Sequence, residues 1–321
     1  MSLFPTAHTV GFDIGGTNLR AGVVTETGQI VDARSIPTPR TITELELGIA
    51  RLVADLRTDH HIEAVGLSVA GFLDPAGEIV RFAPHLPWRD APVRRILSGL
   101  LELPVRLEHD ANSAAWGEYR FGAARGADNW VLLAIGTGIG AALMTGGEIY
   151  RGAFGTAPEF GHLPVVPNGR PCPCGKRGCL ERYCSGTALV TTTAELFASR
   201  RWPDTPLTAR LASHAAGISG QQIFDAARSG DELARAALDS FTHWLGEALA
   251  IASDVLDPEL IVIGGGVSRD SGDFLPEASR RHADRVVGAG HRPLARVGTA
   301  ELGGDAGMIG VADLARQMVT S

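Results

Sequence analysis

A short segment of the chain contains a cluster of potential metal ligands. Cys172, Cys174 and Cys179 lie within eight residues of one another, and His162 precedes the first of them by ten positions. Three thiolates and one imidazole are a common tetrahedral zinc set, and four protein ligands leave no open position on the metal. The spacing therefore predicts a structural zinc site, with buried free cysteines as the alternative. Cys184 has no partner at metal-binding spacing and is expected to be a packed thiol.

A second candidate site begins at Asp13, which ends an apolar stretch and is followed by Gly15, Gly16 and Thr17. Backbone N–H groups in such a turn can donate to phosphate oxygens while the carboxylate holds a hydrated Mg²⁺. The alternative is an ordinary hairpin whose glycines adopt positive φ.

Two further glycine loops follow in the second half of the chain. Thr137 and Gly138 lie in a turn of the same kind, and Gly264, Gly265 and Gly266 come directly after an apolar stretch. Neither the first turn nor the second matches the P-loop or dinucleotide-binding patterns. Together, however, the two turns favour phosphate binding, and the third loop could hold the base and ribose of a nucleotide.

Asp110 stands where a short apolar strand gives way to a helical stretch. Ligands usually bind at this end of the strands in an α/β sheet. A carboxylate there could accept the proton of a substrate hydroxyl, and it could equally cap the helix.

The elements that position these residues alternate along the chain, which predicts an α/β layer architecture. A strand, glycine turn and strand occur in each half, which suggests two similar domains that face each other across a cleft, with a boundary near residues 116–128. A segment rich in glycine, proline and cysteine at 151–186 lacks periodicity and requires a crosslink. Strands are expected at 8–14, 19–24, 30–36, 64–69, 105–108, 130–135, 140–144 and 260–263, and helices at 43–56, 93–100 and 231–256.

Composition restricts the class of partner. The net charge is −7, so a basic surface for nucleic acid is not expected and a small molecule is the default ligand. The first residues do not resemble a signal peptide, and no run of 18 apolar residues occurs, so we expect a cytoplasmic protein without a membrane segment. Four cysteines within 13 residues would be a poor disulfide framework for a chain of 321 residues.

Several segments together resemble the ROK family of sugar kinases and sugar-sensing repressors. They are DIGGTNLR at 13–20, HDANSAAWGEYRFG at 109–122, GTGIGAAL at 136–143, EFGH at 159–162, CPCGKRGCLERYCSG at 172–186 and GGGVS at 264–268. The resemblance implies a two-domain actin-like ATPase fold of the ribonuclease H-like type, whose last helix, near 306–317, crosses back onto the first domain. The implied domains are 1–118 with 305–321, and 119–304, with a zinc-stabilised insertion near 151–186.

The resemblance also implies an activity, namely ATP-dependent phosphorylation of a hexose, most similar to glucokinases, at its 6-hydroxyl with Mg²⁺ present. Asp110 resembles the general base, and His162 is expected to use one ring nitrogen on zinc and the other on the sugar. The implied sugar-binding residues are Gly71, His85, His109, Asp110, Glu159, His162 and Glu181. The implied nucleotide-binding residues are Asp13, Gly15, Gly16, Thr17, Thr137, Gly138, Gly264, Gly265 and Gly266.

The sequence departs from the family pattern at two positions, because His85 and His109 stand where asparagine is usual. A kinase for another hexose or an N-acetylhexosamine, and a non-catalytic sugar-binding relative, therefore stay open as alternatives. A repressor is not expected, because its helix-turn-helix region would precede Asp13, where this sequence has 12 residues. Polyphosphate is a possible donor in place of ATP, and relatives are commonly homodimers or homotetramers.

Overall fold

The computed structural model of the chain describes residues 7–213 and 217–320. Contacts divide the chain into two compact units. Unit 1 comprises residues 1–129, 142–158 and 300–321, and unit 2 comprises 130–141 and 159–299. The domain limits implied by the family resemblance remain a proposal, and their residues 1–6 and 321 lie outside the described part of the chain.

Unit 1 is built on a mixed sheet with the strand order β3-β2-β1-β4-β8. Its strands are β1 His8–Ile14, β2 Asn18–Val24, β3 Ile30–Pro37, β4 Ile62–Val69 and β8 Val105–His109. The first three form an antiparallel meander, whereas β4 and β8 run parallel to β1. All five predicted strands of this unit are confirmed, and the alternation of parallel strands with helices confirms the α/β class.

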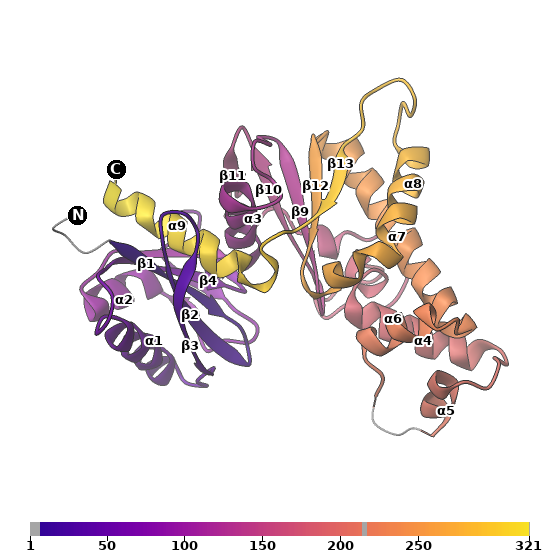
Figure 1. Ribbon diagram of the computed structural model, residues 1–321, viewed down its shortest axis with the longest axis horizontal. Helices are drawn as coiled ribbons and strands as arrows, with labels where there is room; N and C mark the ends of the chain where they lie inside the picture. Colours follow the sequence, from indigo (N-terminus) through magenta and orange to yellow (C-terminus); the bar gives the residue numbers. More distant parts are fainter. Residues whose placement is uncertain (1–6, 214–216, 321) are drawn as a thin grey trace. The chain divides into compact units, whose positions relative to one another are not determined.

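Helices cover both sides of this sheet (Figure 1). They are α1 Ile42–Leu56, α2 Val93–Leu101, α3 Asp110–Phe121 and α9 Ala306–Thr320. α1 begins after Thr41, whose hydroxyl accepts a hydrogen bond from the Glu44 N–H, as a helix N-cap does. Its apolar residues recur every three or four positions, so Leu45, Ile49 and Leu52 enter one buried cluster with the strands.

The last helix packs directly on β1 and β4 because these strands carry glycine at the contact. A Cβ atom on Gly11 would lie 2.0 Å from the Met308 carbonyl oxygen, and one on Gly66 would lie 2.1 Å from that of Val311. Only residues without a Cβ allow this approach of helix and strand backbones. The expected return of the last helix to the first part of the chain is therefore confirmed.

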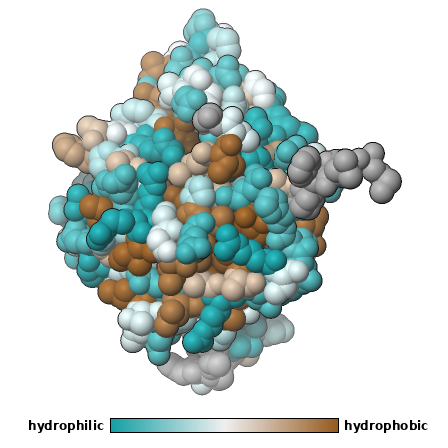
Figure 2. Space-filling model, turned by 90° about the vertical axis from the view of Figure 1, so that its left-hand side faces the viewer, coloured by the Kyte–Doolittle hydropathy of each residue, from teal (hydrophilic) through white to brown (hydrophobic). Residues whose placement is uncertain are grey.

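Unit 1 also contains a small antiparallel sheet, with the strands β5 Phe72–Leu73, β6 Val80–Phe82 and β7 Arg89–Ala91. Figure 2 shows hydrophobic residues in several separate groups among hydrophilic ones on the face drawn there. Ile42, Leu47 and Leu100 are among the exposed apolar residues of this unit. The visible face is thus mixed rather than uniformly apolar.

The second sheet has the order β11-β10-β9-β12-β13. Its strands are β9 Trp130–Ile135, β10 Ile139–Thr145, β11 Glu148–Tyr150, β12 Leu260–Gly264 and β13 Arg296–Thr299. β12 lies parallel to both β9 and β13. The three predicted strands in this sheet are confirmed, and a glycine turn again separates two of them.

Helices and short 3₁₀ turns complete unit 2, apart from the last turn, η4, which belongs to unit 1. They are α4 Gly186–Ser199, α5 Pro206–Ala212, α6 Gly220–Arg228, α7 Glu232–Leu256, α8 Leu275–Arg285, η1 Phe160–His162, η2 Leu180–Arg182, η3 Gly266–Asp273 and η4 Gly303–Asp305. The Asp231 carboxylate caps α7 by accepting a hydrogen bond of 2.8 Å from the Ala234 N–H. Among the described residues, no helix combines the length and apolar character needed to cross a membrane.

Candidate active site

The predicted site residues are distributed over both units, and each group is described within its own unit. Unit 1 carries Asp13, Gly15, Gly16, Thr17, Gly71, His85, His109 and Asp110. Unit 2 carries Thr137, Gly138, Glu159, His162, Cys172, Cys174, Cys179, Glu181, Gly264, Gly265 and Gly266.

The turn between β1 and β2 contains the first glycine pair. Neither Gly15 nor Gly16 has a positive φ, so the explanation of these glycines by backbone conformation is wrong. A Cβ atom on Gly16 would instead lie 2.8 Å from the Cβ atom of His85. Glycine is required here because another segment of the chain approaches the turn.

A cavity of about 600 Å³ opens beside this turn, which is a suitable size for a small ligand. It brings the predicted nucleotide-binding residues Gly16 and Thr17 together with the predicted sugar-binding residue His85. The lining residues are Gly16, Thr17, Pro39, Arg40, Pro84, His85, Leu86 and Pro87. Gly71 lies outside this lining and is required by packing, since its Cβ atom would lie 2.6 Å from the Phe82 carbonyl oxygen.

Asp13 is the next-to-last residue of β1 and lies among charged side chains. The Arg20 guanidinium lies 3.8 Å from the Asp13 carboxylate and 2.5 Å from that of Asp305. Burial raises the pKa of Asp13, Arg20 opposes this effect, and the charges of Asp110 and Asp305 add to it. Carboxylates that repel one another and remain partly solvated suit a hydrated Mg²⁺. Asp305 was missed from the sequence, because 285 residues separate it from Arg20.

Asp110 is the first residue of α3, directly after β8. The N-cap position belongs to His109, whose side chain makes no capping hydrogen bond, so the interpretation of Asp110 as a cap is wrong. Asp110 Oδ1 accepts a hydrogen bond of 2.7 Å from the Ala111 N–H and lies 3.2 Å from His109 Nε2. About half of the Asp110 side chain is exposed, so it can reach a ligand.

The residue before this pair, Glu108, is buried and was also missed from the sequence. Its carboxylate accepts hydrogen bonds from Arg151 Nε at 3.1 Å, from Asn112 Nδ2 at 3.0 Å and from the His109 N–H at 3.1 Å. Burial acts to raise the pKa of Glu108, but Arg151, Asn112 and Arg106 outweigh it and hold that pKa below its usual value. The carboxylate is therefore ionised at neutral pH.

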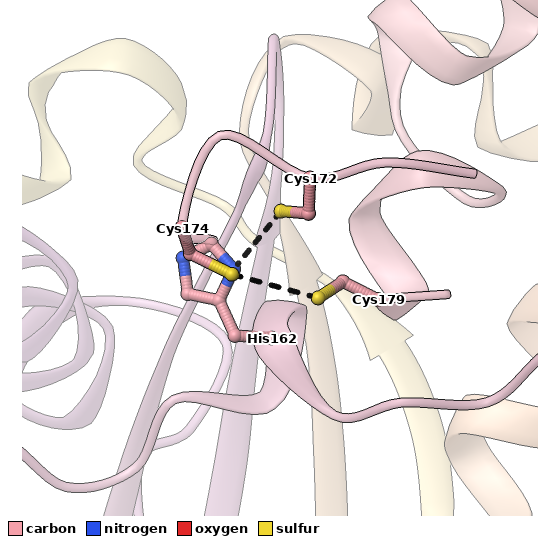
Figure 3. A group of neighbouring side chains, drawn as sticks. All are labelled: His162, Cys172, Cys174 and Cys179. Atoms are coloured by element: carbon pink, nitrogen blue, oxygen red, sulfur yellow. Dashed lines mark hydrogen bonds between the residues drawn. The ribbon is translucent and has the colours of Figure 1, made fainter. Parts of the chain in front are cut away.

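In unit 2 the four predicted metal ligands point toward one another (Figure 3). Their ligand atoms all lie within 4.8 Å of one another, with 3.6 Å between Cys174 Sγ and Cys179 Sγ. Metal–sulfur bonds of about 2.3 Å in a tetrahedron place sulfur atoms about 3.8 Å apart, so the spacing fits zinc. The Cys3His cluster is thus confirmed.

The chemistry of the thiols differs inside and outside this cluster. Burial raises the pKa of the Cys172 thiol to about 12, so a thiolate at this position requires a cation beside it. Cys184 is completely buried, and burial raises its pKa as well. It does not belong to the cluster and is a packed thiol, as expected.

The ring of His162 connects the cluster to two glutamates. Nδ1 lies 3.7 Å from Cys172 Sγ and 3.6 Å from Glu181 Oε1, whereas Nε2 lies 4.0 Å from Glu159 Oε2. Glu181 Oε1 also lies 3.2 Å from Cys172 Sγ. The three side chains predicted to bind sugar hydroxyls in this unit therefore gather beside the predicted metal site.

Glu181 also reaches the glycine turn between β9 and β10. A Cβ atom on Gly138 would lie 2.7 Å from Glu181 Oε2. The third glycine loop approaches the end of β9, because a Cβ atom on Gly265 would lie 2.4 Å from the carbonyl oxygen of Ile135. Gly265 also has a positive φ of +78°. The sheet thus brings the two predicted nucleotide loops of unit 2 close together.

Comparison with known proteins shows which family has this combination of sites. The model of the ROK family matches residues 9–318. The chain belongs to the ROK family. Its curated relatives include a glucokinase of Streptomyces coelicolor, to which this ROK protein is 41% identical over 96% of its own length and 98% of the relative's.

Solved structures of ROK proteins have the same fold. A ROK family glucokinase from Streptomyces griseus, solved with glucose and AMPPNP, is 41% identical with a TM-score of 0.83, over 97% of this ROK protein and 99% of that chain. A ROK hexokinase from Thermus thermophilus is 31% identical with a TM-score of 0.78, over 98% of this protein and 99% of that chain. Both cover essentially the whole of this ROK protein, which supports the actin-like kinase fold expected from the sequence.

Proposed function

We propose that the protein is an ATP-dependent glucokinase that phosphorylates the 6-hydroxyl of glucose. The observation that carries this proposal is the 41% identity with the Streptomyces coelicolor glucokinase over nearly the full length of both chains. The geometry agrees with it, because a half-exposed carboxylate at the start of α3 is available as a base in the unit that also holds the phosphate-type turn.

Asp110 accepts the proton of the sugar hydroxyl as the oxygen attacks the γ-phosphoryl group. His85 and His109 bind hydroxyls of the sugar in unit 1, together with the backbone at Gly71, and Glu159, His162 and Glu181 do so in unit 2. Phosphoryl transfer passes through a loose transition state, so positioning and electrostatic stabilisation supply most of the rate enhancement.

The phosphates of ATP are bound at the first two glycine turns, by backbone N–H groups of Gly15, Gly16, Thr17 and Gly138 and beside Thr137. The third loop, with Gly264, Gly265 and Gly266, holds the base and ribose of the nucleotide. Asp13 would hold a hydrated Mg²⁺, which neutralises charge on the phosphates when bound. Asp305 shares Arg20 with Asp13, so its charge contributes to the electrostatics at this position.

His162, Cys172, Cys174 and Cys179 would hold zinc with a structural role. A zinc ion there would crosslink a segment whose regular structure is limited to short 3₁₀ turns and isolated bridges. Binding through one ring nitrogen of His162 would set the tautomer and orientation of the ring, and the other nitrogen would then serve the sugar.

A second candidate, an N-acetylmannosamine kinase, follows from a different relative. An N-acetylmannosamine kinase of Shigella boydii is 31% identical over 82% of this chain and 84% of the relative. The departures at His85 and His109 affect residues proposed to contact the sugar, so they bear on this choice.

We propose that the protein forms a homodimer or homotetramer, which light scattering would test.

A coupled assay of ADP release decides between these candidates. Purified protein is given ATP with glucose, mannose, galactose, N-acetylglucosamine or N-acetylmannosamine, and with polyphosphate in place of ATP as a separate arm. The proposal expects the highest kcat/KM with glucose and ATP. Preference for N-acetylmannosamine would support the second candidate, and no turnover with any sugar would contradict both.

A further inference from the structure

Glu108 and Arg151 form an ion pair directly beside the proposed base. Building on the proposed function, we propose that this pair is a positioning device that fixes His109 and Asp110 for the sugar. Neither residue was predicted to be part of the site, and neither is proposed to touch the substrate. All of the groups involved belong to unit 1.

Glu108, the acidic member of the pair, controls the position of the proposed base, Asp110. Glu108 is the next-to-last residue of β8, and its carboxylate accepts from the N–H of His109 and from the side-chain amide of Asn112. These two donors lie on either side of Asp110 in the sequence. The carboxylate therefore holds the junction between β8 and α3 from both directions, and a shift of Glu108 would move Asp110 with it.

The other side of the pair holds a loop. Arg151 donates to a single carboxylate oxygen, Glu108 Oε2, from both Nε, at 3.1 Å, and Nη2, at 2.5 Å, and Arg106 Nη2 donates to the same oxygen at 3.3 Å. Its own carbonyl oxygen accepts a hydrogen bond of 3.2 Å from the Ala157 N–H. Arg151 thereby closes the loop 151–157 and ties it to the end of β8.

The loop is also packed against a neighbouring turn. A Cβ atom on Gly155 would lie 3.0 Å from the Leu73 carbonyl oxygen. A small cavity of about 120 Å³ lies between these segments, and its lining includes Glu108, His109 and Arg151. The pair thus connects the strand end, the loop and the turn after β5.

Stability alone does not account for such a pair. Replacing a buried ion pair by apolar residues is often neutral or stabilising, because both charges lose water on burial. Glu108 is 3% exposed and Arg151 is 30% exposed at the side chain, so this cost applies in large part. What the ion pair provides in exchange is a fixed position of Glu108, and therefore of His109 and Asp110, which follow it in the chain.

A matched control is available on α3, the helix that begins with Asp110. Arg120 Nε donates to the buried carboxylate of Asp313 at 3.1 Å, and Trp116 Nε1 donates to the same oxygen at 2.9 Å. Arg120 lies ten residues beyond Asp110 on α3, which corresponds to about 15 Å along the helix. Arg120→Met therefore breaks a comparable ion pair away from the proposed base.

The test compares Arg151→Met, Arg151→Lys, the double variant Glu108→Gln with Arg151→Met, and Arg120→Met. Steady-state kinetics give kcat, the KM for glucose and the KM for ATP, well below each melting temperature. We expect Arg151→Met to lose about 10- to 100-fold in kcat/KM for glucose with the KM for ATP unchanged, because small misplacements of reacting groups cost this much. The kcat/KM of Arg151→Lys for glucose should lie between those of Arg151→Met and wild type, because the lysine ammonium keeps the positive charge but lacks the planar guanidinium donors.

The double variant removes the negative charge that Arg151→Met leaves with Arg106 as its remaining cation, while the amide oxygen can still accept from His109 and Asn112. The double variant should be more active than Arg151→Met and less active than wild type. If Arg151→Met does not fold, the double variant takes its place in the comparison. Arg120→Met should lower the melting temperature with glucose kinetics unchanged. Equal glucose kinetics in Arg151→Met and Arg120→Met, or wild-type kinetics in the folded double variant, would overturn the proposal.

Failure of the proposed function gives a different result. Wild type itself would then prefer another sugar to glucose or turn over none of the sugars, independently of the kinetics of the variants. Calorimetric titration with glucose alone would still compare Arg151→Met with Arg120→Met, and weaker binding only in the former would support the positioning role.

Discussion

The Sγ atom of Cys172 lies 3.7 Å from the Nδ1 atom of His162. Because Nε2 of the same imidazole is turned toward Glu159, one ring belongs both to the Cys3His cluster and to the proposed sugar contacts. Structure and function of this segment are therefore coupled through a single side chain.

This coupling predicts that zinc removal costs stability and sugar affinity together. We expect one zinc per chain, and we expect chelation to lower both the melting temperature and the affinity for glucose. Metal analysis, thermal unfolding and calorimetry before and after chelation measure these quantities. Cys184→Ala should keep the zinc content of wild type, since Cys184 lies outside the cluster. A stable, active preparation without zinc would contradict the prediction.

Asp110→Asn should lose turnover while it retains the sugar. The amide oxygen can still accept from the Ala111 N–H, so the start of α3 keeps its shape, but the amide cannot take a proton. Removal of a general base typically lowers kcat by roughly 10²- to 10⁴-fold. Steady-state kinetics and calorimetric glucose binding measure the two effects. Retention of more than about a tenth of wild-type kcat would show that Asp110 is not the base.

Replacing His85 and His109 by asparagine should change the preference among sugars. Asparagine carries its donor and acceptor on a short stem, whereas imidazole holds them farther apart on a larger ring, so an exchange mispairs at least one hydroxyl. We expect kcat/KM to change by about 5- to 150-fold, from a cost of about 1–3 kcal/mol. The measurement is the ratio of glucose to mannose, galactose and N-acetylglucosamine for wild type and the double variant. Identical ratios would count against any contact of these rings with the sugar.

The contribution of Glu108 to stability should depend on pH. Its pKa in the folded protein lies below the value of about 4.3 typical of an unfolded chain, so its stabilisation is complete above that value. It is lost as the pH falls through the lower folded-state pKa. Glu108→Gln should therefore cost about 1–3 kcal/mol in the free energy of unfolding at pH 7, and the gap to wild type should shrink in acid. Urea unfolding at neutral and acidic pH tests this, and a constant or widening gap would refute it.

The sequence alone determined the elements whose pattern is local. The five strands of the first sheet and the long helix α7 follow from apolar periodicity and turn residues, and the structure confirms them within one or two residues at each end. The short strands β5, β6 and β7 were not predicted. The metal cluster was also accessible, because His162, Cys172, Cys174 and Cys179 lie close in sequence and their spacing carries the ligand pattern.

Tertiary structure decided what depends on distant contacts. Arg20 meets Asp305 across 285 residues, and Glu108 meets Arg151 across 43, so nothing local marks either pair. The alternative explanation of Gly16 by positive φ is wrong, since the approach of His85 requires glycine at this position. Local patterns record the conformational preference of a segment, whereas a close approach or a buried ion pair depends on which segments the folded chain brings together.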